Sequence, residues 1–170
     1  VERVLRDRGY SRPVHVRGHV ILGQFHMERH DRSNVVHALD IHWRVAAPLL
    51  VERLLPAGLV RASAVPLPAL SPDAWAPGLP QALALACLHL GAHHWDAPDL
   101  LWLHDLRMLA DALSPDDTRV FVSLATTRRF STLASRVLDA ARQECPSRSL
   151  DALVAALPRD PSEAALKLLA

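Results

Sequence analysis

The stretch VVHALDIHWRV, residues 35–45, decides the fold class because apolar and polar residues alternate along it. A period of two is the repeat of a β-strand, whose successive side chains point to opposite faces. One face of this predicted strand carries Leu39, Ile41, Trp43 and Val45, and the other carries Ala38, Asp40, His42 and Arg44. The first face is apolar and can pack, whereas the second gathers a carboxylate, an imidazole and a guanidinium.

A partner strand is predicted at residues 13–22, where β-branched side chains partly alternate with polar ones. A polar segment, residues 28–34, then supplies the turn. The two runs predict an antiparallel hairpin or the remnant of a larger sheet. Upstream, residues 1–9 are typical of the last turns of a helix that ends at Gly9, and nothing in this opening marks a natural start of the chain.

Helical patterns replace the strand pattern after Pro48. We expect a proline-rich connection at 59–78 and helices at 48–55, 80–94, 98–113, 116–127, 131–144, 150–157 and 161–169. Ser114 is the predicted N-cap of the fourth of these, with Pro115 in its first turn and Asp117 three residues after the cap. Trp75, Trp95 and Trp102 are expected to anchor packing between helices. The predicted fold class is therefore α+β.

Composition excludes several function classes. The 170 residues carry a formal net charge of +1, and half of them are hydrophobic, which fits one folded domain rather than a disordered tail. Near-neutral charge disfavours a long nucleic acid as partner. The longest apolar stretch, residues 79–90, is too short to span a membrane, and Cys87 and Cys145 match no disulfide or metal framework. These features predict a cytoplasmic protein.

Asp40 is the first candidate functional residue. A lone aspartate on a strand is usually a solvated edge charge, but aspartate is unfavourable in strands and this one lies in mid-strand. A carboxylate on a rigid element suits a hard divalent cation, which prefers oxygen ligands. One carboxylate alone cannot make a metal site, so the pattern requires further ligands.

A second candidate site lies among the histidines of the helical part. His89 and His93 are four residues apart on one helix face, and His104 and Asp105 follow as an adjacent pair. This set suggests a His/Asp metal-dependent phosphohydrolase, provided that the side chains converge at about 2.0–2.2 Å from one ion. The alternative is that these residues form the polar edge of a buried helix. A further alternative is a non-catalytic helical interaction module, which a large exposed apolar patch beside the first strand would favour.

The order of three segments carries a resemblance. They are the helix end Leu-Arg-Asp-Arg-Gly-Tyr at 5–10, the strand Leu-Asp-Ile-His-Trp-Arg at 39–44, and the helical pair at 84–95 and 101–106 with its His-Leu-x-x-His-His-Trp and Trp-Leu-His-Asp-Leu patterns. In this order, over roughly residues 1–145, they resemble the uncharacterised bacterial nucleotidyltransferases with a polymerase-β-like fold. The resemblance implies that residues 1–47 are the C-terminal part of a nucleotidyltransferase α/β core and that 48–170 form a helical domain.

The resemblance also implies a chemistry. Asp40 would be the third acidic residue of a catalytic site that binds Mg²⁺ or Mn²⁺, and His42 and Arg44 would bind the nucleotide. The substrate would be a nucleoside triphosphate, and the acceptor a small molecule or a peptide. His93 and Asp105 match recurring positions of the family whose roles are orienting or structural.

The sequence departs from the family pattern in one respect. The Gly-Ser turn that cradles the triphosphate and the Asp-x-Asp segment after it do not occur in these 170 residues. We expect both to lie upstream of residue 1, within a longer protein. The resemblance therefore predicts that this polypeptide alone lacks nucleotidyl transfer activity.

Overall fold

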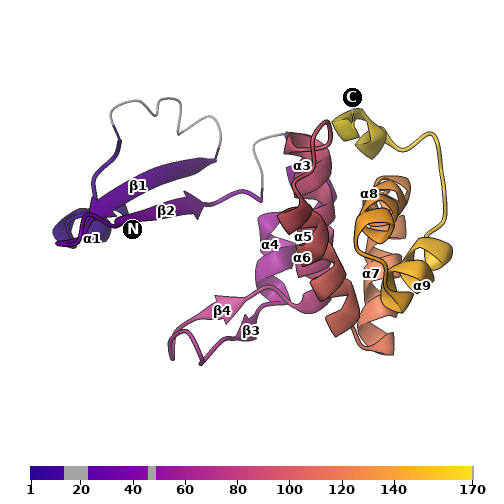
Figure 1. Cartoon of the computed structure of the whole chain (residues 1–170), viewed down its shortest axis with the longest axis horizontal. Helices are drawn as coiled ribbons and strands as arrows, with labels where there is room; N and C mark the ends of the chain where they lie inside the picture. Colours follow the sequence, from indigo (N-terminus) through magenta and orange to yellow (C-terminus); the bar gives the residue numbers. More distant parts are fainter. Residues whose placement is uncertain (14–22, 46–48, 170) are drawn as a thin grey trace.

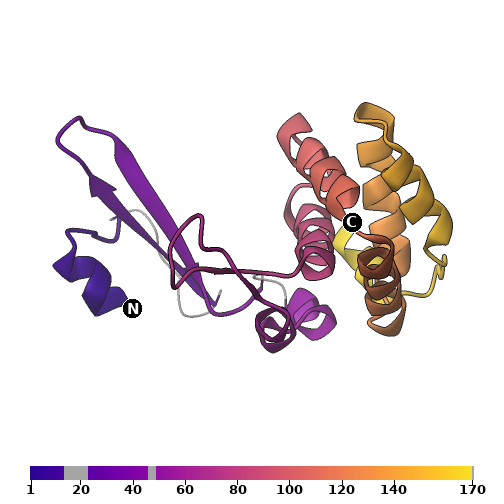
Figure 2. The same ribbon diagram turned by 90° about the horizontal axis from the view of Figure 1, so that it is seen from below.

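The computed structural model describes residues 1–13, 23–45 and 49–169, and the fold is α+β, as predicted. A short helix and a two-stranded sheet form the N-terminal part, and helices form nearly all of the rest (Figure 1). Figure 2 shows the same two parts from below, with the long hairpin extending away from the helices. The predicted division between residues 47 and 48 falls outside the described residues and stays a prediction.

The long hairpin contains the strand that the sequence singled out. Strand β1, Gln24–His30, pairs antiparallel with β2, Val36–His42, and the register sets His26 opposite Asp40. The turn between them is closed by Asp31, whose carboxylate accepts hydrogen bonds from the backbone N–H groups of Ser33 and Val35. The register of the pairing confirms the predicted alternation of β2, because it places Asp40 and His42 on one face of the strand.

The partner strand is not the predicted one. Residues 14–22, which hold most of the predicted partner, lie outside the described residues, and β1 occupies 24–30, part of which was assigned to a polar turn. Phe25 and Met27 do alternate with polar neighbours, and both are buried. Strand β1 contains no β-branched residue, and polar side chains surround Phe25 and Met27, which concealed the strand.

The segment that follows the N-terminal helix contacts the β1 half of the hairpin's apolar face, where the Arg29 guanidinium lies 5.0 Å from the centre of the Tyr10 ring. Helix α1, Glu2–Asp7, ends before Gly9, whose φ of +82° is the left-handed conformation expected of a helix C-cap. The guanidinium of Arg12 lies 5.3 Å from the centre of the Phe25 ring. On β2 the same face is more open, since Leu39 and Trp43 are exposed.

The helical part has one continuous hydrophobic core. Its elements are α3 Leu49–Leu54, α4 Ala57–Ala62, α5 Leu79–His93, α6 Leu100–Ala112, α7 Pro115–Thr127, α8 Ser131–Glu144, α9 Arg148–Ala156 and the 3₁₀-helix η1 Ala164–Leu169. The predicted capping box of α7 is confirmed, because Ser114 Oγ accepts from the Asp117 N–H and the Asp117 carboxylate accepts from the Ser114 N–H. Phe121 and Phe130 are fully buried in this core. No helix in the described part of the chain is both long enough and apolar enough to cross a membrane.

The structure corrects three details of the helical part. The connection predicted at 59–78 contains most of α4 and a small hairpin of β3, Val65–Pro66, and β4, Trp75–Ala76, because the prolines punctuate short elements rather than prevent them. Trp75 lies on that small hairpin with 64% of its surface exposed, so it anchors no helix packing. The last segment forms a 3₁₀-helix instead of the predicted α-helix. Cys87 and Cys145 are free thiols.

One buried carboxylate joins the C-terminal segment to the helices. Glu163 has only 4% of its surface exposed and receives hydrogen bonds from the backbone N–H groups of Ser131 and Thr132, at 3.1 and 2.8 Å, and from the Ser131 hydroxyl at 2.7 Å. These N–H groups belong to the first turn of α8, which has no side-chain cap from its own N-cap residue, Phe130. Glu163 therefore takes over the capping of α8 from a distance of more than thirty residues.

Candidate functional site

Asp40 belongs to a chain of three hydrogen-bonded side chains on the polar face of the hairpin. The Nδ1 atom of His26 lies 2.9 Å from Asp40 Oδ1, and its Nε2 atom lies 2.9 Å from Glu28 Oε1. Cross-strand pairing brings His26 and Asp40 together, and a spacing of two places Glu28 on the same face as His26. Sequence reasoning missed His26 and Glu28, since only the register of β1 shows that they face Asp40.

The two carboxylates favour a protonated imidazole. The hydrogen bond to Asp40, and next the one to Glu28, raise the pKa of His26 above its usual value. A protonated His26 donates from both ring nitrogens, and one oxygen of each carboxylate accepts. The Asp40 side chain remains 60% exposed, so it is held in one orientation and still open to a ligand.

The donor set of the described residues does not by itself fit a bound divalent metal. His26 lies between Asp40 and Glu28 and engages one oxygen of each, so the two carboxylates do not converge on a common point. Within residues 1–13, 23–45 and 49–169, no group of three His, Cys, Asp or Glu side chains could hold a metal ion. Asp40 offers one carboxylate, and a metal site here requires donors from elsewhere.

The other two predicted site residues follow Asp40 at the end of β2. His42 is exposed on the same face as Asp40. The Arg44 side chain crosses the backbone of Gly23, whose φ is +70°, so closely that a Cβ atom there would lie 2.6 Å from Arg44 Cδ. Glycine is therefore required at position 23 for two reasons: the backbone has a positive φ, and a side chain there would collide with Arg44.

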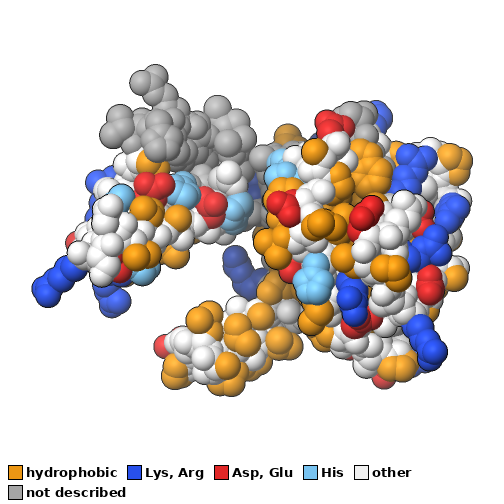
Figure 3. Space-filling view, viewed as in Figure 1, with side chains coloured by type: hydrophobic (Ala, Val, Ile, Leu, Met, Phe, Trp, Pro, Cys, Tyr) orange, Lys and Arg blue, Asp and Glu red, His pale blue; other side chains and the backbone are white. Residues whose placement is uncertain are grey.

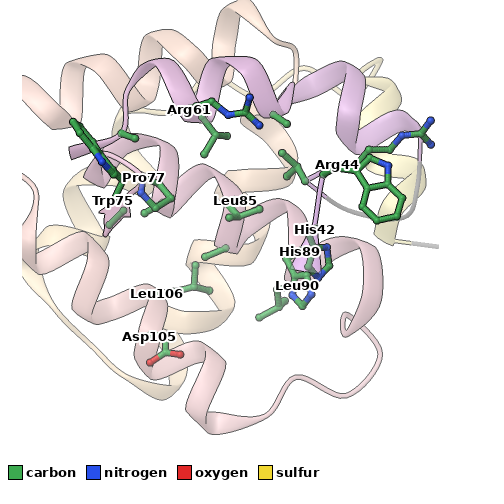
Figure 4. A pocket seen from close by; sticks show the side chains of 18 of the residues that line it. His42, Arg44, Arg61, Trp75, Pro77, Leu85, His89, Leu90, Asp105 and Leu106 are labelled. Carbon is green, nitrogen blue, oxygen red and sulfur yellow. The ribbon is translucent and has the colours of Figure 1, made fainter. Parts of the chain in front are cut away.

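A cavity of about 720 Å³ lies where the end of β2 meets the helical part. We call it the β2–α5 cavity; His42, Trp43 and Arg44 line its β2 side, and residues of α4, β4, α5 and α6 form the rest. In the space-filling view a hollow separates the hairpin from the helical part (Figure 3). Figure 4 shows Trp75 and Pro77 at one end of the cavity and His42 and His89 at the other. Its volume is that of a small-molecule site.

The histidines of α5 form a packed cluster rather than a metal centre. The ring centroid of His89 lies 5.1 Å from that of His93 and 5.2 Å from that of His94, and the His94 ring lies 3.6 Å from Trp102. His104 and Asp105 are exposed on α6. Because the described residues hold no three-ligand metal group, the side chains proposed for a phosphohydrolase do not meet its geometric requirement.

His26 of the hairpin and the histidine cluster of α5 contribute to the stability of the fold with opposite dependence on pH. Partial desolvation and the neighbouring His93 and His94 lower the pKa of His89, and the pKa of His93 is lowered by desolvation and by His94. The cluster thus stabilises the fold fully above a pH of about 6.5 and loses that contribution as the pH falls. The raised pKa of His26 works the other way: its contribution is full below a pH of about 6.5 and is lost as the pH rises through the folded pKa.

Histidine titration followed by NMR tests this assignment. We expect the Cε1–H signal of His26 to titrate above the ordinary histidine range and those of His89 and His93 below it, with His26→Gln and His89→Gln providing the assignments. Asp40→Asn should move the His26 midpoint down and leave His89 in place. A His26 midpoint at or below that of His89 would contradict the hydrogen-bonded chain.

Comparison with known proteins identifies the family to which the chain belongs. The molecule is an α+β protein with an exposed strand carboxylate that a hydrogen bond to His26 orients. The family model described as uncharacterised nucleotidyltransferase matches residues 1–144. The chain belongs to this uncharacterised nucleotidyltransferase family, which confirms the resemblance noted in its sequence. No curated protein and no solved structure matches the chain.

Proposed function

We propose that the chain contributes to transfer of a nucleoside monophosphate from a nucleoside triphosphate to an acceptor, with Asp40 at the reacting centre. Family membership supports the reaction class. The observation that carries the assignment to Asp40 is its hydrogen bond of 2.9 Å to His26, which fixes one carboxylate oxygen on a rigid strand while the side chain stays exposed. We assign His42 and Arg44 to contacts with the phosphates, since both lie beyond Asp40 at the end of β2.

The proposed reaction is an in-line displacement at the α-phosphorus. An acceptor hydroxyl oxygen forms the new bond to phosphorus, the bond from that phosphorus to the bridging oxygen of the β-phosphate breaks, and pyrophosphate leaves with the electron pair. The hydroxyl proton passes to the Asp40 carboxylate. His26 keeps that carboxylate oriented, and Glu28 keeps the imidazole oriented in turn.

A divalent cation, Mg²⁺ or Mn²⁺, would neutralise the phosphate charge in such a reaction. The described residues supply one carboxylate toward it, and neither the Gly-Ser turn nor an Asp-x-Asp segment occurs in the 170 residues. We therefore propose that these 170 residues do not catalyse the transfer alone. We place the protein in the cytoplasm, on the basis of its two free thiols.

A labelled transfer assay tests the function. With α-³²P-labelled nucleoside triphosphates and Mg²⁺ or Mn²⁺, we expect no label on any acceptor, including the chain itself, from the 170-residue polypeptide. The product of the complete reading frame should transfer label and release unlabelled pyrophosphate. Activity of the 170 residues alone would refute the requirement for further residues, and an inactive complete product would favour the non-catalytic interaction module, for which the exposed Leu39 and Trp43 provide a contact surface.

A further inference from the structure

The β2–α5 cavity has a distribution of side chains that selects a class of ligand. Its walls are mainly apolar, with Leu85 of α5 and Leu106 of α6 facing the interior in Figure 4. Trp75 closes one end, and Trp43 and Trp102 also contribute to the lining. Indole rings provide large flat surfaces for an aromatic or aliphatic body. Such a lining favours a ligand with an apolar or aromatic body over a bare phosphate.

Charged side chains on opposite walls of the cavity would orient a bound ligand. Arg61, on α4, lies on the opposite side of the cavity from Asp105 of α6 (Figure 4). Among the described residues, neither Arg61 nor Arg44 forms a salt bridge, whereas several other arginines of the chain do. A guanidinium beside an apolar cavity pairs well with a carboxylate, sulfonate or phosphate. The anionic group of a ligand is therefore drawn toward α4 and away from Asp105.

One end of the cavity reaches the proposed reacting centre. His42 lines the cavity and shares a strand face with Asp40, two residues earlier, which corresponds to about 7 Å along a strand. His42 is also among the groups whose charge lowers the pKa of His89, so the end of β2 and helix α5 are electrostatic neighbours. A group on the ligand that extends past His42 thus approaches the Asp40 carboxylate.

We propose that the β2–α5 cavity is the acceptor site, and that the acceptor is an organic anion with an apolar or aromatic body. Its acidic group pairs with Arg61, its body lies against Leu85, Leu106 and the indoles, and its hydroxyl extends past His42 toward Asp40. This assignment rests on the proposed nucleotidyl transfer for the role of the ligand, but not for its binding. A volume of about 720 Å³ accommodates a small molecule or the end of a peptide rather than a polymer.

Two matched fluorescent probes test the binding chemistry. 1-Anilinonaphthalene-8-sulfonate carries an aromatic body and a sulfonate, and N-phenyl-1-naphthylamine has the same body without the charge. We expect one saturable site on the 170-residue chain that binds the sulfonate about tenfold more tightly than the neutral probe, the effect of one charge-assisted hydrogen bond. Energy transfer from the cavity tryptophans to the bound probe reports its location.

Variants connect the signal to the cavity. Arg61→Met should abolish the preference for the sulfonate and leave binding of the neutral probe intact, while Arg53→Met, on the exposed side of α3, should change neither. Ala86→Phe should block both probes by filling the cavity, and Ala64→Phe provides the same test from another wall if the first variant is poorly folded by circular dichroism. Equal affinity for the two probes, or binding unaffected by both Phe variants, would overturn the proposal.

A competition experiment separates this proposal from the proposed function. Addition of ATP with Mg²⁺ should leave the sulfonate probe bound, because the proposed phosphate contacts, His42 and Arg44, lie at the β2 end of the cavity, whereas the sulfonate pairs with Arg61 of α4. Displacement by ATP would overturn the assignment to the acceptor by showing that the cavity takes the nucleotide. Asp40→Asn should leave probe binding unchanged, so a failure of the transfer chemistry does not affect this readout.

Discussion

Asp40→Asn is expected to lower nucleotide transfer by the complete protein at least about 100-fold, the usual scale of a lost general base. Asparagine has nearly the same size and keeps an oxygen for the hydrogen bond from His26, which in the native chain is 2.9 Å long. It removes the negative charge and the ability to accept a proton. The rate measured with α-labelled triphosphate at saturating acceptor should therefore fall without loss of the fold.

Two companion variants show whether the loss belongs to the site. Asp73→Asn removes a carboxylate from an exposed loop of the helical part and should leave the rate unchanged. His26→Gln removes the imidazole that orients Asp40, so we expect a smaller loss together with a change in the pH profile of the rate. Full activity of Asp40→Asn would show that another group takes the acceptor proton.

The position of Asp40 on the polar face of a strand could be predicted because the evidence is local. Residues 35–45 alternate between apolar and polar side chains, and this pattern alone determines which of them share a face. The caps of α1 and α7 are equally local signals, since Gly9 and Ser114 act within one turn of their own helices. Such signals need no knowledge of distant contacts.

The partners of Asp40 could not be predicted in the same way. His26 and Glu28 lie on a strand whose composition resembles a polar turn, and their meeting with Asp40 depends on a cross-strand register. The β2–α5 cavity depends on the relative placement of β2, α4, α5 and α6, which no local pattern specifies. A local sequence pattern therefore predicts the position of Asp40, whereas the residues that surround it depend on tertiary structure.

Glu163 is the clearest case of such a tertiary effect. The sequence predicts only that Glu163 belongs to a helix at 161–169, whereas its carboxylate caps α8 through Ser131 and Thr132. Burial of the carboxylate at a helix N-terminus is favourable because the unpaired N–H groups and the helix dipole both attract negative charge. The Thr132 hydroxyl adds a bond of 2.9 Å to the Asp160 carbonyl, which attaches the C-terminal segment at a second point.

Glu163→Ala is expected to destabilise the chain by about 3 kcal/mol, because it leaves two buried N–H groups and the Ser131 hydroxyl without their acceptor. For a chain of this size that loss corresponds to a decrease in Tm of about 6–12 °C. The Tm of Glu163→Gln should fall between those of the native chain and Glu163→Ala. Its amide keeps one oxygen acceptor but turns an N–H₂ group toward other donors. Thermal unfolding followed by circular dichroism measures all three chains.

Glu144→Ala is the matched control, because Glu144 is an exposed carboxylate near the other end of the same helix. Surface substitutions of this kind change stability by no more than about 0.5 kcal/mol, and removing a negative charge near a helix C-terminus is mildly favourable. A stable Glu163→Ala chain together with an unstable Glu144→Ala chain would contradict the capping role of Glu163. It would mean that the first turn of α8 satisfies its N–H groups without the C-terminal segment, and that residues 160–169 can detach from the helical core at little cost.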